Sequence, residues 1–151
     1  MLLAFSLLSA SDPFIGVWKL DPTRSQFGPG APGFFFATVQ VESSSSGLKS
    51  TASAATDEGF ASDFAFNCSL DRTPCRVVAA TSLRGASATD AISLKRADDH
   101  TIIATGTKGD KPVYTDRRVV SKDGRTMTVT RQGTTPGGTR YESTIILVRV
   151  R

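Results

Sequence analysis

Short hydrophobic runs alternate with turn-forming clusters along nearly the whole chain. The runs are rich in Val, Ile, Thr and Phe, and the clusters between them carry Gly, Pro, Asp and Ser. Runs of roughly 7–12 residues at regular spacing are typical of an antiparallel barrel or sandwich. No window shows a sustained 3.6-residue period with caps, so no long helix is expected. The pattern predicts strands at 14–20, 34–43, 48–56, 60–69, 76–82, 88–96, 101–108, 111–120, 126–133 and 140–151.

Residue alternation within these runs supports strands that are half buried. Phe60, Phe64 and Phe66 fall on one face of their run, whereas the last run is apolar on both faces near its end. Asp123-Gly124 between two apolar runs is the clearest hairpin signal. We therefore expect an all-β fold, an antiparallel up-and-down barrel of about 8–10 strands.

One segment breaks the repeating pattern. Residues 21–33 contain three prolines and three glycines, which exclude a strand or a long helix, so we expect a short irregular crossover after the first strand. Residues 28–33 also match G-x-G-x-x-G. Because Pro29 and Pro32 remove two backbone donors and no helix follows, the match does not indicate a dinucleotide site.

The N-terminus indicates an exported protein. Residues 1–11 are uncharged and apolar and end in small residues, as the remnant of a secretory signal does, although a short segment packed on the domain is the alternative. Residues 12–151 then form one domain. With no stretch of about 18 apolar residues, no transmembrane segment is expected. The expected location is periplasmic or extracellular.

The cysteine pair agrees with export. Cys68 and Cys75 flank an Asp/Pro turn, and we expect a structural disulfide across a local hairpin, which persists only in oxidising compartments. Metal binding and two buried thiols are the alternatives. A metal site needs more ligands, and the single histidine, His100, is distant in sequence. We expect neither a metal nor a cofactor.

Basic residues gather in the last third of the chain. Residues 101–151 hold ten Lys or Arg against four acids, a net charge of +6 in a chain whose total is +4. Such a bias attracts anionic lipid or polysaccharide, although solvated strand faces explain it more simply. Base-stacking aromatics do not interleave with these residues, so no nucleic-acid partner is expected. We expect a monomer.

No catalytic constellation is visible in the sequence. There is no G-x-S-x-G nucleophile motif. His100 falls in a predicted turn, and the adjacent acids Asp57-Glu58 and Asp98-Asp99 occupy turns, where carboxylates are usually solvated. We expect a non-catalytic protein, with a small lyase or isomerase that uses the barrel cavity as the alternative.

The first strand carries a resemblance to a known family. Gly16-Val17-Trp18 is a G-x-W motif in which the glycine allows a bend and the indole fills one barrel end. Followed by a Pro-rich crossover and a β-meander, it resembles the lipocalin or calycin superfamily over about residues 13–151. Residues 16–27 and 117–129 are similar to small exported bacterial lipocalin-like proteins of uncharacterised function.

This resemblance implies a binding function and a set of site residues. In lipocalins a C-terminal basic side chain commonly lies over the tryptophan. Here Arg149 or Arg151 could do so, and Arg149 is favoured because it shares a face with Ile145 and Leu147. The mouth of the barrel would bind a small hydrophobic or amphipathic molecule, with Tyr114 or Arg117 as polar anchor. The expected walls are Phe34, Phe36, Phe60, Phe64, Phe66 and Ile92.

Two alternatives to a ligand pocket remain open. The phenylalanines would instead fill a solid core, as they often do in small barrels. A ligand-free envelope module would then use its basic strand surface to contact anionic lipid or polysaccharide.

Overall fold

The computed structural model describes residues 11–56, 61–79, 89–135 and 137–150. Among these residues there is no helix, and therefore none that could cross a membrane. The expected signal remnant falls almost wholly outside the described residues. The strands are β1 (Gly16–Leu20), β2 (Phe34–Ser43), β3 (Leu48–Thr56), β4 (Ala61–Cys68), β5 (Cys75–Arg76), β6 (Val78–Ala79), β7 (Ala91–Asp98), β8 (Thr101–Lys108), β9 (Lys111–Val120), β10 (Thr126–Thr134) and β11 (Arg140–Arg149).

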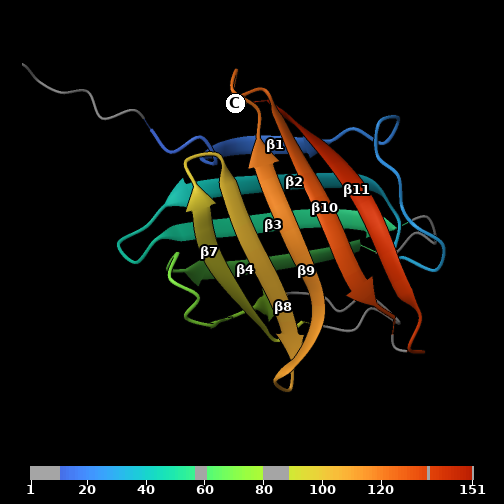
Figure 1. The fold of residues 1–151 in the computed structure, drawn as a ribbon. Coiled ribbons are helices and arrows are strands. Elements are labelled where there is room, and N and C mark those ends of the chain that lie inside the picture. Colours follow the sequence, from blue (N-terminus) through green and yellow to red (C-terminus); the bar gives the residue numbers. More distant parts are fainter. Residues whose placement is uncertain (1–10, 57–60, 80–88, 136, 151) are drawn as a thin grey trace, which may run out of the picture.

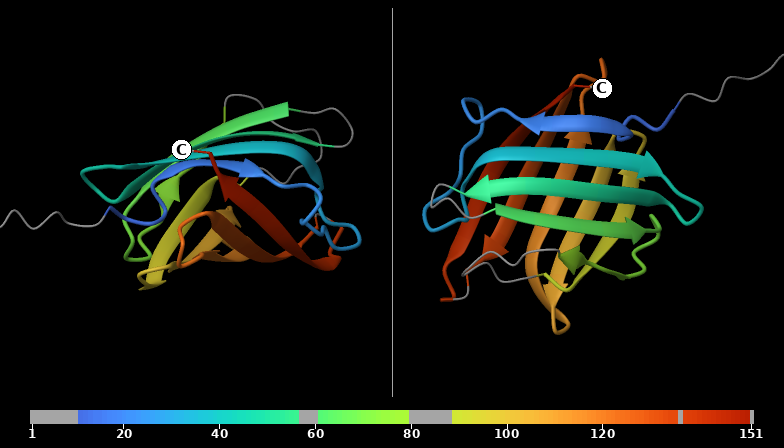
Figure 2. Two further views of the ribbon diagram at one scale, coloured as in Figure 1. Left: turned by 90° about the horizontal axis from the view of Figure 1, so that it is seen from above. Right: turned by 180° about the vertical axis from the view of Figure 1, so that it is seen from behind.

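The strands form one antiparallel, nearly closed barrel in up-and-down order, which confirms the predicted fold class. Neighbours follow the order β5-β7-β8-β9-β10-β11-β1-β2-β3-β4-β6. In Figure 1 the strands β7 to β11 run steeply across the front and β1 to β4 run almost horizontally behind them. Figure 2 shows the two groups as crossing layers, so the barrel is flattened and its interior lies between them.

The structure differs from the sequence prediction at the seam of the barrel, by which we mean the junction between the β5–β7 edge and the β4–β6 edge of the sheet. The run 76–82 was expected to be one strand, but it divides into β5, which pairs with β7, and β6, which pairs with β4. The loop before β5 also lies along β7, since the amide of Arg72 donates to the carbonyl of Leu94 at 2.8 Å. This stretch of chain thus connects the two ends of the sheet, and each short strand satisfies backbone groups on a different edge.

The Pro/Gly-rich segment is irregular, as predicted, but it stays beside β11. Gln26 forms an isolated antiparallel bridge with Thr144. The chain loops out before this bridge around Asp21, whose carboxylate accepts hydrogen bonds from Thr23 and Arg24. The Thr23 hydroxyl and then Arg24 lower the pKa of Asp21 to about 2. At Gly28 a side chain would collide with the carbonyl oxygen of Glu142, so the close approach to β11 requires glycine.

One end of the barrel, which we call the tryptophan end, is filled by apolar side chains. Trp18 is fully buried, and its indole N–H donates to the carbonyl of Phe14 at 3.0 Å. Around it lies a continuous core drawn from both layers. The core's large members are Phe14, Trp18, Leu20, Leu48, Phe66, Ile92, Leu94, Ile102, Met127, Ile145 and Leu147.

Arg149 seals the tryptophan end. Its guanidinium carbon lies 4.3 Å from the ring centre of Trp18, the arrangement that the lipocalin resemblance implied. The same guanidinium donates to the carbonyls of Gly124, Ile15 and Pro13 at 2.5–2.6 Å. Arg149 therefore fastens the segment before β1 to the β9–β10 turn. Gly16 at the start of β1 has φ of +146°, a conformation that glycine adopts readily.

Candidate functional site

The aromatic residues expected to line a pocket differ in their burial. Phe66 and Ile92 are buried in the core, 5% and 2% exposed. Phe34 and Phe64 are partly buried and pack against the same core. Of the two other expected wall residues, Phe36 is 40% exposed, and Phe60 lies outside the described residues.

The two predicted anchors occupy opposite faces of β9. Tyr114 faces inward with Asp116, Arg118 and the buried Val120, since alternate residues of a strand share a face. Arg117 is exposed on the outer face, so its placement does not fit an anchor inside the barrel. The interior cation comes instead from Arg118 and from Arg131 of β10.

These residues form an ionic cluster inside the barrel. Asp116 is fully buried, and both of its oxygens are engaged. Arg131 donates to it side-on, through Nε to Oδ1 at 2.7 Å and through Nη2 to Oδ2 at 2.9 Å. Arg118 donates to Oδ2 through Nη2 at 2.9 Å and through Nε at 3.3 Å. One carboxylate thus accepts four hydrogen bonds from two guanidinium groups, which we call the Asp116 cluster.

The electrostatics of the cluster keep its members charged. Burial alone would raise the pKa of Asp116, but the charge and hydrogen bonds of Arg131, and then those of Arg118, hold that pKa below its ordinary value of 3.8. Burial likewise opposes the charge on Arg131, but Asp116 outweighs it and raises the pKa of Arg131. An ionised Asp116 held by four donors is poorly suited to act as a general base.

Two tyrosines flank the Asp116 cluster, each lying over a glycine. The Tyr114 ring packs on Gly106, where a Cβ atom would come 2.5 Å from the ring. Tyr141 packs on Gly133 in the same way, and a Cβ atom added to Gly133 would come 2.5 Å from the Cζ atom of Tyr141. The guanidinium carbon of Arg131 lies 4.0 Å from the ring centre of Tyr114, a cation–π contact. Glycines on neighbouring strands therefore make room for both rings, and the Tyr114 ring packs against Arg131.

The cluster belongs to the end of the barrel opposite the tryptophan end. We call it the hairpin end, because the turns at 109–110 and 137–138 lie there, at the bottom of Figure 1. Tyr114 and Asp116 lie nearer to this end than Val120 does, in the same cross-strand rows as the core residues Ile92 and Leu94. A groove of about 510 Å³ lies at the same strand ends, with Tyr114, Gly133 and Tyr141 among its lining residues.

The outer face is less basic than the composition suggested. Among the described basic residues after position 100, three have interior partners: Arg118 and Arg131 in the Asp116 cluster, and Arg149 over Trp18. The structure therefore moves part of the positive charge from the surface to the inside. Among the described residues, no group of three or more His, Cys, Asp or Glu could hold a metal ion.

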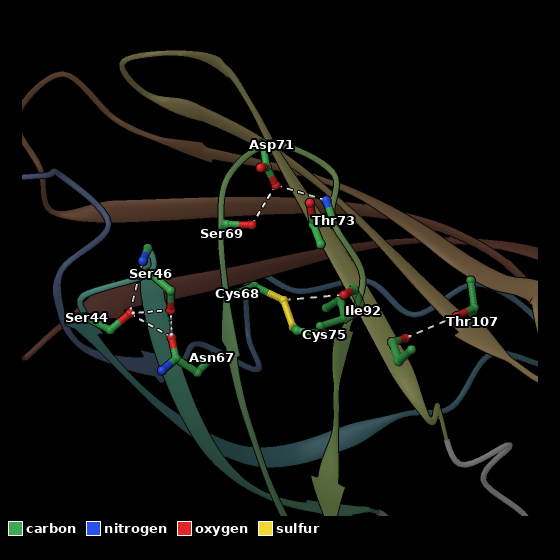
Figure 3. Close-up of a disulfide and its surroundings, with 12 residues drawn as sticks. Ser44, Ser46, Asn67, Cys68, Ser69, Asp71, Thr73, Cys75, Ile92 and Thr107 are labelled. Atoms are coloured by element: carbon green, nitrogen blue, oxygen red, sulfur yellow. Dashed lines mark hydrogen bonds between the residues drawn. A yellow bond between two sulfur atoms is a disulfide. The ribbon is translucent and has the colours of Figure 1, made fainter.

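The expected disulfide between Cys68 and Cys75 is present, but it does not span a hairpin. Cys68 ends β4, whereas Cys75 pairs with Ile92 of β7. Figure 3 shows the bond next to Ile92, below a turn in which Asp71 accepts hydrogen bonds from Ser69 and Thr73. The bond thus joins the two strands on either side of the seam and helps to close the barrel.

Comparison with known proteins adds no family to this picture. No protein-family model matches the chain, and no curated protein is significantly similar to it.

Proposed function

We propose that this protein is a non-catalytic, lipocalin-like barrel that binds a small hydrophobic or amphipathic molecule at its hairpin end. The observation that carries the proposal is the Asp116 cluster, a group of charged residues inside a barrel whose opposite end is filled with apolar side chains. Arg118 and Arg131 keep 20% and 21% of their side-chain surface exposed, so part of each arginine is accessible although Asp116 between them is buried. An amphipathic ligand matches this gradient from polar to apolar surroundings.

Titration with the neutral fluorescent amphiphile N-phenyl-1-naphthylamine tests this function. We expect saturable fluorescence enhancement with one probe per chain, because an interior site has a fixed capacity. Arg118→Leu makes the interior wall more apolar and should change the Kd severalfold. Arg117→Leu, one residue along on the outer face, is the matched control and should leave the Kd unchanged. Absence of saturable binding, or equal effects of both substitutions, would contradict an interior site.

We also propose that the protein is exported to the periplasm or the extracellular space. The disulfide at the barrel seam supports this location, because such bonds persist in oxidising compartments. The test is fractionation of the native cells followed by alkylation with iodoacetamide without reductant. We expect unmodified Cys68 and Cys75 in the exported fraction. Two alkylated cysteines in the cytoplasmic fraction would contradict the proposal.

A further inference from the structure

The Asp116 cluster contains more positive than negative charge. Arg118 and Arg131 each carry a full positive charge, and Asp116 supplies the single carboxylate between them. All four hydrogen bonds that reach Asp116 come from these two residues. The carboxylate is therefore saturated, and one formal positive charge inside the barrel has no counter-charge within the cluster.

The arginines also have donors to spare. Each uses Nε and Nη2 on Asp116, and among the described residues neither Nη1 donates a hydrogen bond. Every side-chain nitrogen or oxygen of the described residues that is fully inaccessible has a hydrogen-bond partner, so each unpartnered Nη1 keeps some accessible surface. Both Nη1 atoms are thus free to donate to a further group.

The side chains around Arg131 limit the direction from which a ligand can approach its guanidinium. The Tyr114 ring covers one face of the Arg131 guanidinium at 4.0 Å, which leaves the edge that carries Nη1 as an approach. A guanidinium edge matches the oxygens of a planar carboxylate. Tyr141 stands diagonally across from Arg131 in the β10–β11 register. Burial raises the pKa of its phenol, which keeps the hydroxyl protonated and able to donate.

An unbalanced charge in an environment of low polarity is costly, and an anion relieves that cost, whereas a neutral or cationic group does not. We propose that the ligand is a carboxylic acid with an apolar body, bound as its anion at the Nη1 atoms of Arg118 and Arg131. This inference rests on the proposed binding function and specifies the class of ligand.

Displacement of bound N-phenyl-1-naphthylamine from the wild-type protein at pH 7.4 tests the proposal. The competitors are decanoate, methyl decanoate and decylamine, which share a ten-carbon chain and differ in charge. We expect decanoate to displace the probe at a concentration about tenfold or more lower than the ester, because hydrogen bonds to charged groups are among the strongest in proteins. Decylamine should be the weakest competitor. Equal potency of acid and ester would overturn the acid inference and leave the binding function standing.

Failure of the probe itself to bind would instead overturn the binding function, so the two failures are distinguishable. Arg118→Gln adds a check on the residue, since Arg131 still neutralises Asp116 in that variant. We expect it to abolish the preference for decanoate over the ester, whereas Arg117→Gln on the outer face should retain it. The wild-type comparison needs no variant and decides the question even if Arg118→Gln does not fold. A preference that persists in a folded Arg118→Gln protein would exclude Arg118 from the site.

Discussion

Arg117 and Arg118 are neighbours in the chain, yet one faces solvent and the other lies inside the barrel. Strand alternation alone separates them. In β10 the alternation of Met127 and Val129 with threonines places Arg131 on the apolar face. In β9 both Val119 and Val120 are apolar, so the sequence does not tell which face of that strand points inward. Charged residues at inward positions nevertheless look like solvated strand positions until their partners are known, and the Asp116 cluster joins two strands.

Substitution of Arg131 should be far more costly than substitution of Arg117. Arg131→Leu leaves a buried carboxylate with one partner instead of two, and we expect the free energy of unfolding to fall by about 3 kcal/mol. Arg117→Leu should change it by less than about 0.5 kcal/mol, as surface substitutions usually do. Urea denaturation measures both. Equal losses in the two variants would mean that Arg131 is not held in a buried ion pair.

A double-mutant cycle isolates the pair itself. Asp116→Leu combined with Arg131→Leu should cost less than the sum of the two single substitutions, because the double variant leaves no unpaired charge from this pair. Additive losses would contradict direct coupling between Asp116 and Arg131.

The lowered pKa of Asp116 makes a contribution to stability that depends on pH. Its folded-state pKa lies below the ordinary value of 3.8, so the stabilisation is fully present above that value. It is lost as the pH falls through the folded-state pKa. Carboxyl-carbon NMR titration should find Asp116 still ionised at pH 3.8. A midpoint above 3.8 would show that burial outweighs the two arginines.

At the level of the strands, local sequence predicted most elements well. The runs 34–43, 48–56, 101–108 and 111–120 match strands β2, β3, β8 and β9 at both ends, because turn residues bound them on each side. The run 76–82 failed because it crosses the seam, and its pairing depends on strands that are distant in sequence. The cysteine pair was identified for the same local reason, but its role at the seam was not.

The seam makes the disulfide important for the stability of the barrel. Replacement of Cys68 and Cys75 by serine removes a cross-link over eight residues, and we expect a loss of about 2.5 kcal/mol on the chain-entropy model. Amide hydrogen exchange should rise first in β5 and in the neighbouring part of β7, since these strands lie at the seam. Uniform exchange across all strands, or no loss of stability, would contradict a seam-closing role.

Across the whole molecule, the two ends of the barrel differ in chemistry. The tryptophan end is apolar and is fastened by Arg149. The contact of Arg149 with Trp18 was expected from the lipocalin resemblance that the G-x-W motif carries. The hairpin end holds the Asp116 cluster, the two tyrosines and the groove. Sequence reasoning placed the pocket among the phenylalanines, which are the strongest apolar signals. Of these, Phe66 belongs to the core, and Phe34 and Phe64 pack against it. The candidate site lies among residues whose burial only the three-dimensional pairing reveals.

The most direct test of binding at the hairpin end is amide NMR of the ¹⁵N-labelled protein during titration with decanoate. The account predicts saturable shift changes that centre on Tyr114, Asp116, Arg131 and Tyr141. The indole N–H of Trp18 at the opposite end should keep its position. No shifts at millimolar decanoate, or shifts confined to outer-face residues such as Arg117, would contradict binding inside the barrel.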